Sequence, residues 1–381
     1  MIDEFHFDYI IIGNGLAGLQ LALKMTSDSF FDNKQIALID VSEKKTNDKT
    51  WSFWETKPSQ WNDLTYKTWE HATVITSKKN IDLNLKPYQY KSIKSIDFYR
   101  HSISKLKKHS NIHFIKEKVY SVNESKQALV KTNKNTYTCN HVFDSRIPNI
   151  SSGQIKNYTY LIQHFKGWVI KTNTAVFDNN KITMMDYRLK DGEQTTFTYI
   201  LPFSKNEALI EFTYFTENTV TEAIYDTYIK TYIDTYLKIE NYTVIETEMG
   251  QIPMTNFPFY KYNTKKTTKI GTAGGWVKGS TGYSFKHTEK KAAIIIGNLK
   301  ANRIPSHNLF KSKYMFYDKV FLKVLKDENY KGEWIFQQFY DKNSIQTMFR
   351  FLDEESSFIE EIKIMWSLFS WSFIKAFFKT L

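Results

Sequence analysis

The strongest constraint on the fold lies near the start of the chain, where a β-branched stretch runs into a glycine-rich turn. Residues 8–12 are rich in isoleucine, residues 13–18 are Gly-Asn-Gly-Leu-Ala-Gly, and residues 19–25 are mostly apolar. This order predicts a strand, a tight turn and a helix. In a dinucleotide-binding turn, Gly13 permits the tight bend, Gly15 lets a pyrophosphate reach the backbone, and Gly18 lets the helix pack closely on the strand. Leu16 and Ala17 complete the predicted cofactor contact.

A second strand follows at the spacing that this motif requires. Residues 35–39 predict it, and it ends in Asp40, about 20 residues after the turn, where a carboxylate accepts hydrogen bonds from ribose hydroxyls. After Asp40 come a polar loop and an aromatic cluster at 51–54 instead of another regular βα unit. An early insertion of this kind favours FAD over a nicotinamide cofactor. The alternative is a glycine turn that binds no nucleotide.

The whole chain predicts an α/β (α+β) fold in four segments. Residues 1–155 are expected to form the first part of a Rossmann-like FAD-binding domain, with a substrate-side insertion near 50–92. Alternating apolar and polar residues between 156 and 262 predict an inserted antiparallel-sheet substrate domain. Residues 263–300 return to the FAD-binding domain, and residues 301–381 form a helical, aromatic-rich C-terminal region. This is the organisation of hydroxylase-like flavoproteins.

Composition and charge exclude some partners. The chain has 52 Lys and Arg against 40 Asp and Glu, a net charge of +12. Almost all of the basic residues are lysines, whereas bidentate recognition of bases and phosphates is usually an arginine task, so we expect no nucleic-acid partner. The single cysteine, Cys139, excludes disulfide frameworks and cysteine-based zinc sites. We therefore expect no metal and a reducing, cytoplasmic setting.

The C-terminal region contains an aromatic run at residues 362–379, punctuated by Lys363, Lys375 and Lys379. No run reaches the roughly 18 uncharged apolar residues of a membrane-spanning helix. On one helical wheel its polar residues fall on two sides, so it is not a clean amphipathic stripe. Two interpretations remain open: an interfacial membrane helix, or a helix packed against the protein or within an oligomer.

Several blocks of residues are together more specific than the glycine turn. They lie at 48–54 (Asp-Lys-Thr-Trp-Ser-Phe-Trp), 185–188 (Met-Asp-Tyr-Arg), 201–213, 250–255 (Gly-Gln-Ile-Pro-Met-Thr) and 270–283. In this order they resemble lycopene β-cyclases of the bacterial and plant type. The resemblance implies a carotenoid-biosynthesis flavoprotein, an isomerase-type enzyme that converts lycopene to β-carotene through γ-carotene without net redox change. It also implies FAD that is active when reduced, with NAD(P)H as the reductant.

Ring closure needs an acid that stays protonated near neutral pH, and the resemblance assigns this role to Glu211. Burial in an apolar pocket raises a carboxyl pKa because it disfavours the anion. On the predicted strand Leu209 and Glu211 share one face, and Ile210 and Phe212 share the other. The alternative is a solvent-facing glutamate. Plant-type cyclases commonly have a second acid where this chain has Phe212, so the final proton acceptor is left open between Glu211, water and another group.

Six further residues are candidate substrate contacts: Trp51, Phe53, Trp54, Asp186, Tyr187 and Arg188. Aromatic faces stabilise a desolvated cation, so the four aromatic residues are candidates for lining a polyene tunnel. The alternative for each is ordinary core packing. Asp186 and Arg188 flank Tyr187 and either form a structural ion pair or shape the site beside the flavin.

Two late segments complete the predicted cofactor site. Gly271, Thr272, Ala273, Gly274 and Gly275 follow a predicted strand, at the place where the wider FAD fold has Gly-Asp to hold the ribityl chain. Threonine replaces that aspartate, as in lycopene cyclases. Asp144 ends another predicted strand and resembles the second acidic turn near the cofactor, with a plain turn residue as the alternative.

The expected substrates, lycopene and monocyclic carotene, are insoluble in water, so we expect peripheral association with a membrane lipid surface and possible contact with other carotenoid-pathway enzymes. Lysines near a surface attract anionic lipid. Two other functions stay open: an FAD-dependent monooxygenase, halogenase or prenyl reductase acting on another apolar isoprenoid, and a non-catalytic flavin or carotenoid-binding protein. Whether one or two rings are closed, and the oligomeric state, are not determined by the sequence.

Overall fold

The first of three sheets contains the strand and turn at the start of the chain. The computed structural model describes residues 5–150 and 152–381. The sheet has the strand order β8-β2-β1-β11-β10-β9, and β17 also pairs with β11. β1, β2, β8, β11 and β17 run parallel to one another, whereas the hairpin of β9 and β10 pairs with β11 in the antiparallel direction. The strands are β1 (Phe5–Ile12), β2 (Ile36–Ile39), β8 (Ile112–Ile115), β9 (Val119–Glu124), β10 (Ala128–Thr132), β11 (Thr136–Asp144) and β17 (Thr267–Lys269).

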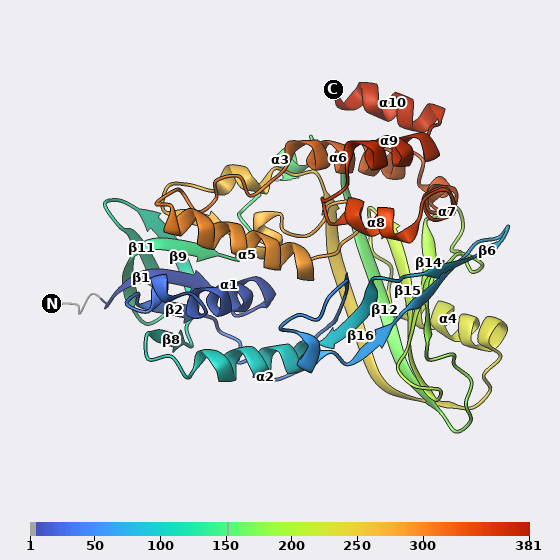
Figure 1. Ribbon diagram of the computed structural model, residues 1–381, viewed down its shortest axis with the longest axis horizontal. Coiled ribbons are helices and arrows are strands. Elements are labelled where there is room, and N and C mark those ends of the chain that lie inside the picture. Colours follow the sequence, from blue (N-terminus) through green and yellow to red (C-terminus); the bar gives the residue numbers. More distant parts are fainter. Residues whose placement is uncertain (1–4, 151) are drawn as a thin grey trace.

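Helices pack on this sheet because its parallel strands are apolar on both faces. All four residues of β2 are buried, as expected for a central parallel strand. Helix α1 (Leu16–Thr26) lies against α2 (Ser95–Leu106) and α5 (Phe285–Lys300), and their apolar side chains form one core with the inner face of the sheet (Figure 1). The predicted strand–turn–helix is therefore confirmed at its predicted position.

A second, mostly antiparallel sheet stands beside the first and has the order β16-β12-β15-β14-β13-β5-β6 (Figure 1). β5 and β6 come from the segment near 50–92, and β5 pairs with β13 in parallel. A third sheet of β3, β7 and β4 is formed by strands from the segment between β2 and β8. The strands are β3 (Thr50–Glu55), β4 (Lys67–Trp69), β5 (His71–Ile75), β6 (Asn80–Asn84), β7 (Gln89–Lys94), β12 (Tyr160–Thr172), β13 (Lys181–Asp186), β14 (Thr196–Pro202), β15 (Glu207–Thr216) and β16 (Tyr242–Thr255).

The two faces of the second sheet are covered by different helices. Helix α4 (Glu222–Tyr232), extended by a π-helical turn (Ile233–Leu237), packs on one face with Ile210 and Phe212. Leu209 points to the other face, where the C-terminal helices complete a larger core. The alternation predicted for this strand is thus confirmed. Whether the four predicted segments fold as separate units stays a prediction.

The C-terminal region is helical, as predicted, but the aromatic run at 362–379 is not one helix. It is divided between α9 (Phe358–Ser367) and α10 (Trp371–Thr380), because Ser370 is extended at φ −162°. One helical wheel drawn over residues 362–379 therefore superimposes the faces of two different helices. This is why no continuous apolar stripe appears on it. The other helices are α6 (Ser312–Asp327), α7 (Gly332–Lys342), α8 (Ile345–Leu352) and the short α3 (Ser152–Ile155). Across residues 5–150 and 152–381, no helix has the length and apolar character to cross a membrane.

Two glycines of the first turn offer a matched test of packing. A Cβ at Gly18 would lie 2.0 Å from the Gly13 carbonyl oxygen, whereas a Cβ at Gly15 would meet no heavy atom within 4 Å. We expect Gly18→Ala to lower the free energy of unfolding by about 1–3 kcal/mol through overpacking, and Gly15→Ala to leave it nearly unchanged. Urea denaturation of the flavin-free proteins measures both. Equal stability of the two variants would contradict the close approach of α1 to β1.

Candidate active site

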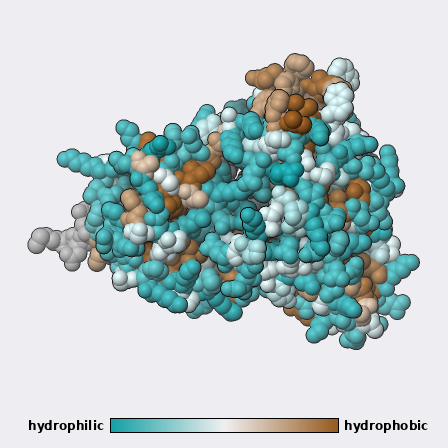
Figure 2. All heavy atoms as spheres, in the orientation of Figure 1, coloured by the Kyte–Doolittle hydropathy of each residue, from teal (hydrophilic) through white to brown (hydrophobic). Residues whose placement is uncertain are grey.

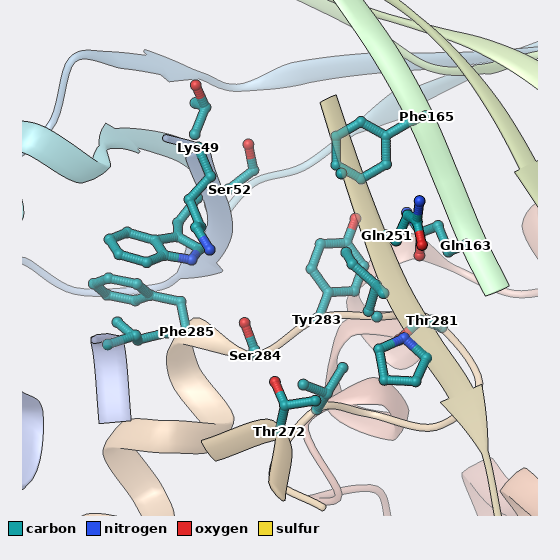
Figure 3. A pocket seen from close by; sticks show the side chains of 18 of the residues that line it. Lys49, Ser52, Gln163, Phe165, Gln251, Thr272, Thr281, Tyr283, Ser284 and Phe285 are labelled. Carbon is teal, nitrogen blue, oxygen red and sulfur yellow. The ribbon is translucent and has the colours of Figure 1, made fainter. Parts of the chain in front are cut away.

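A cavity of about 780 Å³ lies between the first and second sheets. One end is lined by Gly15, Leu16, Ala17 and Gly18 of the glycine-rich turn, and the other reaches Phe336 of α7. Figure 3 shows Lys49 and Ser52 on one side and the β12 side chains Gln163 and Phe165 opposite them. Thr272, Tyr283 and Ser284 come from the segment between β17 and α5, and Phe285 is the first residue of α5. The cavity thus joins the turn predicted for the cofactor to the sheet predicted for the substrate.

A row of paired residues crosses four strands at the cavity. Glu211 of β15 pairs with Tyr199 of β14 on one side and with Gly167 of β12 on the other, and Gly167 also pairs with Glu248 of β16. Directly paired residues project to the same face of a sheet. A Cβ at Gly167 would lie 3.4 Å from both Glu211 Cβ and Glu248 Cγ. Gly167 therefore leaves the space between two glutamates that line one cavity.

The surroundings of both carboxyl groups favour the neutral, protonated form. Burial raises the pKa of Glu211 well above its usual value of 4.5, and the nearby charge of Glu248 raises it further. Burial also raises the pKa of Glu248, to about 7, although a hydrogen bond from Thr50 opposes the shift. Thr213 donates to Glu211 at 2.7 Å. The cavity accordingly contains one strongly retained proton and one carboxyl group that titrates near neutral pH.

Four hydroxyl groups form a connected chain beside Glu211. Tyr199 donates to Ser52 at 3.2 Å and lies 2.8 Å from the Tyr90 hydroxyl, which is 3.2 Å from the Tyr283 hydroxyl. Burial raises the pKa of all three tyrosines well above 10.0, so their hydroxyls stay protonated. These side chains present neutral aromatic surface and fixed dipoles to the cavity.

The glycine-rich turn leaves the beginning of α1 open. Helix α1 starts after Gly15 without any side-chain hydrogen bond at its N-cap, and its first-turn residues line the cavity. Free N–H groups at a helix N-terminus attract phosphate. Gly13 has a φ of +101°, and a Cβ there would lie 2.0 Å from Ser145 Oγ. The space beside Gly15 and the uncapped helix fit a pyrophosphate.

The second predicted cofactor segment meets this turn. Gly271 has a φ of +61°, and a Cβ on it would lie 3.2 Å from Ala17 Cβ. Gly271 and Thr272 line the cavity, whereas Ala273 and Gly274 are buried behind them. Gly275 ends the 3-10 turn Gly271–Gly274 with a φ of +69°, and the next regular helix begins only at Phe285.

The two predicted acidic cofactor residues hold the backbone around the cavity and are not among its lining residues. Asp40 accepts hydrogen bonds from the Asn14 N–H at 2.7 Å and from the Ser42 N–H at 2.8 Å. Asp144 is 1% exposed and accepts from Lys269 and from the Arg146 guanidinium at 2.8 to 2.9 Å. It thereby joins β11 to β17.

Of the six predicted substrate contacts, Trp51 is among the residues that line the cavity. The other five are not among its lining residues. Phe53 stacks on Phe285 at 4.6 Å, Trp54 stacks on Phe349 at 4.3 Å, and Tyr187 is 1% exposed in the core next to the C-terminal helices. Asp186 is buried and accepts from Arg188 at 2.6 Å, in the structural ion pair that was one of the two alternatives.

Glu248 is one of the cavity residues that sequence reasoning missed. It lies two residues before the quoted block at 250–255, and the alternating pattern of that strand places it on one face with Gly250. The pattern does not say which strand lies next to β16, so only the β15–β12–β16 order brings Glu248 to Glu211. Gln163, whose Oε1 is buried without a hydrogen-bond partner, and Tyr283 were also missed. Among the described residues, no group of three or more His, Cys, Asp or Glu side chains is placed to hold a metal ion.

Comparisons with known proteins identify relatives of this sequence. The family model described as lycopene cyclase protein matches residues 8–377. A chromoplastic capsanthin/capsorubin synthase of Citrus sinensis is 24% identical over 310 residues. That alignment covers 75% of this chain and 58% of the relative, so the chain spans somewhat more than half of the relative's length.

Solved structures share the fold at low sequence identity. A geranylgeranyl bacteriochlorophyll reductase-like protein of Thermoplasma acidophilum matches with a TM-score of 0.62 and 11% identity, covering 99% of this chain and 100% of that one. A flavoprotein/dehydrogenase of Cytophaga hutchinsonii matches with a TM-score of 0.62 and 11% identity, covering 94% and 99%. A flavin-dependent brominase matches with a TM-score of 0.59 and 13% identity, covering 95% and 93%. The predicted fold class is confirmed.

The buried carboxyls predict how stability depends on pH. In the fold they keep protons that the unfolded chain loses near pH 4.5, so their contribution to stability is complete below that pH and is lost as the pH rises through the folded-state pKa values. The loss is roughly 1.4 kcal/mol per pH unit for each group within its window. Because glutamine does not ionise, we expect Glu211→Gln to stabilise the protein relative to wild type at about pH 8 and not at about pH 4.

Urea denaturation at the two pH values measures this difference. Glu193→Gln, at an exposed position outside the cavity lining, controls for the loss of a negative charge. If Glu211→Gln and wild type show the same dependence of stability on pH, the retained proton at Glu211 is contradicted.

Proposed function

The chain belongs to the lycopene cyclase family, and we propose on this premise that it converts lycopene to β-carotene through γ-carotene. The reaction is acid-catalysed and redox-neutral, so the enzyme is an intramolecular lyase of isomerase type. The observation that carries the proposal is Glu211, a carboxyl group whose raised pKa keeps it protonated in the wall of a cavity that also contains the glycine-rich turn.

Glu211 supplies the proton that starts ring closure. Protonation of a terminal trisubstituted alkene requires an acid that is loaded when the substrate arrives, and a buried neutral carboxyl meets this requirement. The hydrogen bond that Thr213 donates holds one carboxyl oxygen as an acceptor and orients the group. General acid catalysis of this kind contributes about 10² to 10⁴ in rate.

The tyrosines beside Glu211 stabilise the positive charge that protonation creates. Tyr90, Tyr199 and Tyr283 are neutral, and their hydroxyl groups are joined to one another by hydrogen bonds. An aromatic face next to a desolvated cation contributes up to about 2 kcal/mol. The same rings exclude water, which would otherwise capture the carbocation as an alcohol.

FAD is the cofactor that we assign to the cavity. Its pyrophosphate fits the open N-terminus of α1 beside Gly15, and Thr272, which lines the same cavity, is the proposed contact for the ribityl chain. When bound in its reduced form, FAD supplies a negative charge that stabilises a neighbouring carbocation in a low-dielectric site. NAD(P)H is the proposed reductant.

Expression in a lycopene-accumulating bacterial host tests the activity. We expect wild type to produce β-carotene, and Glu211→Gln to reduce ring formation by at least about 10²-fold while FAD binding persists. Glu207→Gln is the matched control, because Glu207 begins the same strand and alternates onto the same face but lies outside the cavity lining. Pigment chromatography and the flavin content of the purified proteins measure the outcome.

Other outcomes identify the competing functions. Unchanged lycopene together with substrate-dependent consumption of NAD(P)H would replace the cyclase with a monooxygenase, halogenase or prenyl reductase. Carotenoid binding that Glu211→Gln leaves intact, without any product from the wild type, would indicate a non-catalytic binding protein. Rings formed by Glu211→Gln at the wild-type rate would remove Glu211 from the mechanism.

The C-terminal helices provide the proposed membrane contact. Trp366, Trp371 and Phe378 are 74%, 80% and 70% exposed, and Figure 2 shows apolar side chains gathered over α9 and α10. An apolar cavity of about 310 Å³ lies beneath these helices and shares Phe336 and Phe339 with the larger cavity. A hydrocarbon leaving a bilayer would reach the large cavity by this path. Exposed aromatic residues with neighbouring lysines suit an interfacial position.

Vesicle binding tests this surface. We expect Trp366→Ser/Trp371→Ser/Phe378→Ser to weaken binding to phosphatidylcholine–phosphatidylserine vesicles by at least about tenfold, because each buried aromatic contributes about 1.5–3 kcal/mol. The matched control, Phe5→Ser/Tyr120→Ser/Tyr330→Ser, removes three exposed aromatics elsewhere. Co-sedimentation measures both. Equal binding of the two triple variants would contradict a membrane contact at α9 and α10.

A further inference from the structure

Ring closure on lycopene adds one proton to the substrate and removes another, so a second group has to take the proton that leaves. We propose that Glu248 is this base, and that it returns the proton to Glu211 across the gap left by Gly167. The inference rests on the proposed cyclase function and deepens it, because it names the acceptor of the ring proton. It also supplies the second carboxyl group that Phe212 excludes from the position next to Glu211 in sequence.

The geometry places both carboxyl groups on one surface. Gly167 is the shared partner of Glu211 and Glu248 in the β15–β12–β16 register, and both glutamates line the large cavity. A side chain at position 167 would separate them, since its Cβ alone would lie 3.4 Å from an atom of each. The two residues thus flank a position that has no side chain of its own, next to the Leu209 methyl group, whose Cδ1 would lie 2.8 Å from a Cβ at Gly167, and both line the same cavity.

The surroundings of the two carboxyls set different proton affinities. Glu211 accepts one hydrogen bond, from Thr213, and its pKa is raised well above 4.5, first by burial and then by the charge of Glu248. Glu248 accepts from Thr50 at 3.0 Å and feels the charges of Lys94 and Glu246. Burial raises the pKa of Glu248 to about 7 against the hydrogen bond from Thr50, so its anion is populated at neutral pH while Glu211 keeps its proton.

The proposed cycle balances protons and electrons. Glu211 gives its proton to the terminal alkene, the next alkene supplies the electron pair of the new carbon–carbon bond, and the positive charge moves into the ring. The Glu248 carboxylate then takes a proton from the ring carbon next to the cation, and that C–H electron pair becomes the ring double bond. Transfer of the proton from Glu248 to the Glu211 carboxylate restores the starting state without an oxidant or a reductant.

Glu248 also determines where the double bond forms, because the position of the base selects which hydrogen is lost. In Glu248→Gln, water or another group has to take a proton from a less favoured carbon. We expect ring formation to fall about 10² to 10⁴-fold and the remaining product to include rings with a displaced double bond, of ε or γ type. A residue that only supports the sheet would lower the yield without changing the ring type.

The experiment uses full-length, flavin-loaded wild type, Glu248→Gln and Glu248→Asp, with lycopene presented in liposomes. Chromatography quantifies the rate and the ring type, and the rate is followed from about pH 5 to 9. Wild type should gain activity as the pH rises through the titration of Glu248 and lose it when Glu211 deprotonates. Glu248→Asp should keep the rising limb and the β ring, whereas Glu248→Gln should lose both. Glu207→Gln, which lies outside the cavity lining, should resemble wild type in ring type.

Each outcome decides between the proposals. Wild type that makes no ring rejects the cyclase function itself. Wild-type ring closure together with a Glu248→Gln rate within threefold and an unchanged ring type rejects only the role of Glu248. If Glu248→Gln does not fold with flavin, the wild-type profile and Glu248→Asp decide: a profile without a rising limb near pH 7, or Glu248→Asp with a displaced double bond and a normal rate, overturns the assignment.

Discussion

The interaction on which the site depends is the burial of two carboxyl groups on either side of a glycine. Gly167 is paired with Glu211 and with Glu248, and burial raises the pKa of both carboxyl groups, while the charge of Glu248 raises that of Glu211 further. Such a pair is destabilising where both groups ionise, since like charges in a poorly solvated site repel strongly. The surrounding sheet holds them in place because Ile210 and Phe212, the neighbours of Glu211, are packed against α4 on its far side.

The cavity exists because two sheets of different construction meet beside it. The parallel sheet is apolar on both faces and ends its strands at the glycine-rich turn, where α1 leaves free amide groups. One face of the antiparallel sheet packs against α4. The other face lines the large cavity and packs against the C-terminal helices. In the proposed function, the polar cofactor group and the apolar polyene thus have separate surfaces within one cavity. The helices α9 and α10 leave their aromatic side chains outside, next to a second cavity that shares a wall with the first.

Patterns among residues that are close in sequence were sufficient to predict much of this architecture. The turn at Gly13, Gly15 and Gly18, the strand leading to Asp40 and the alternation around Glu211 depend on residues that are close in sequence, and the structure places each as expected. Aromatic residues were harder to assign, because a core ring and a tunnel ring have the same composition. Phe53, Trp54 and Tyr187 are not among the lining residues, whereas Tyr199 and Tyr283, which line the cavity, had no distinguishing pattern.

The sequence by itself determined that a strand and turn of the dinucleotide-binding type lie near residues 8–18 and that an antiparallel sheet follows. It also determined that Glu211 projects to the opposite face of its strand from Ile210 and Phe212. These properties follow from backbone periodicity, which a single strand expresses without its partners. Only the tertiary structure decided that β12 lies between β15 and β16, and therefore that Glu248 faces Glu211 across Gly167. Strand order is a long-range property, set by packing among segments that are far apart along the chain. This strand order brings Glu248 next to Glu211, so the site contains two neighbouring carboxyl groups instead of one.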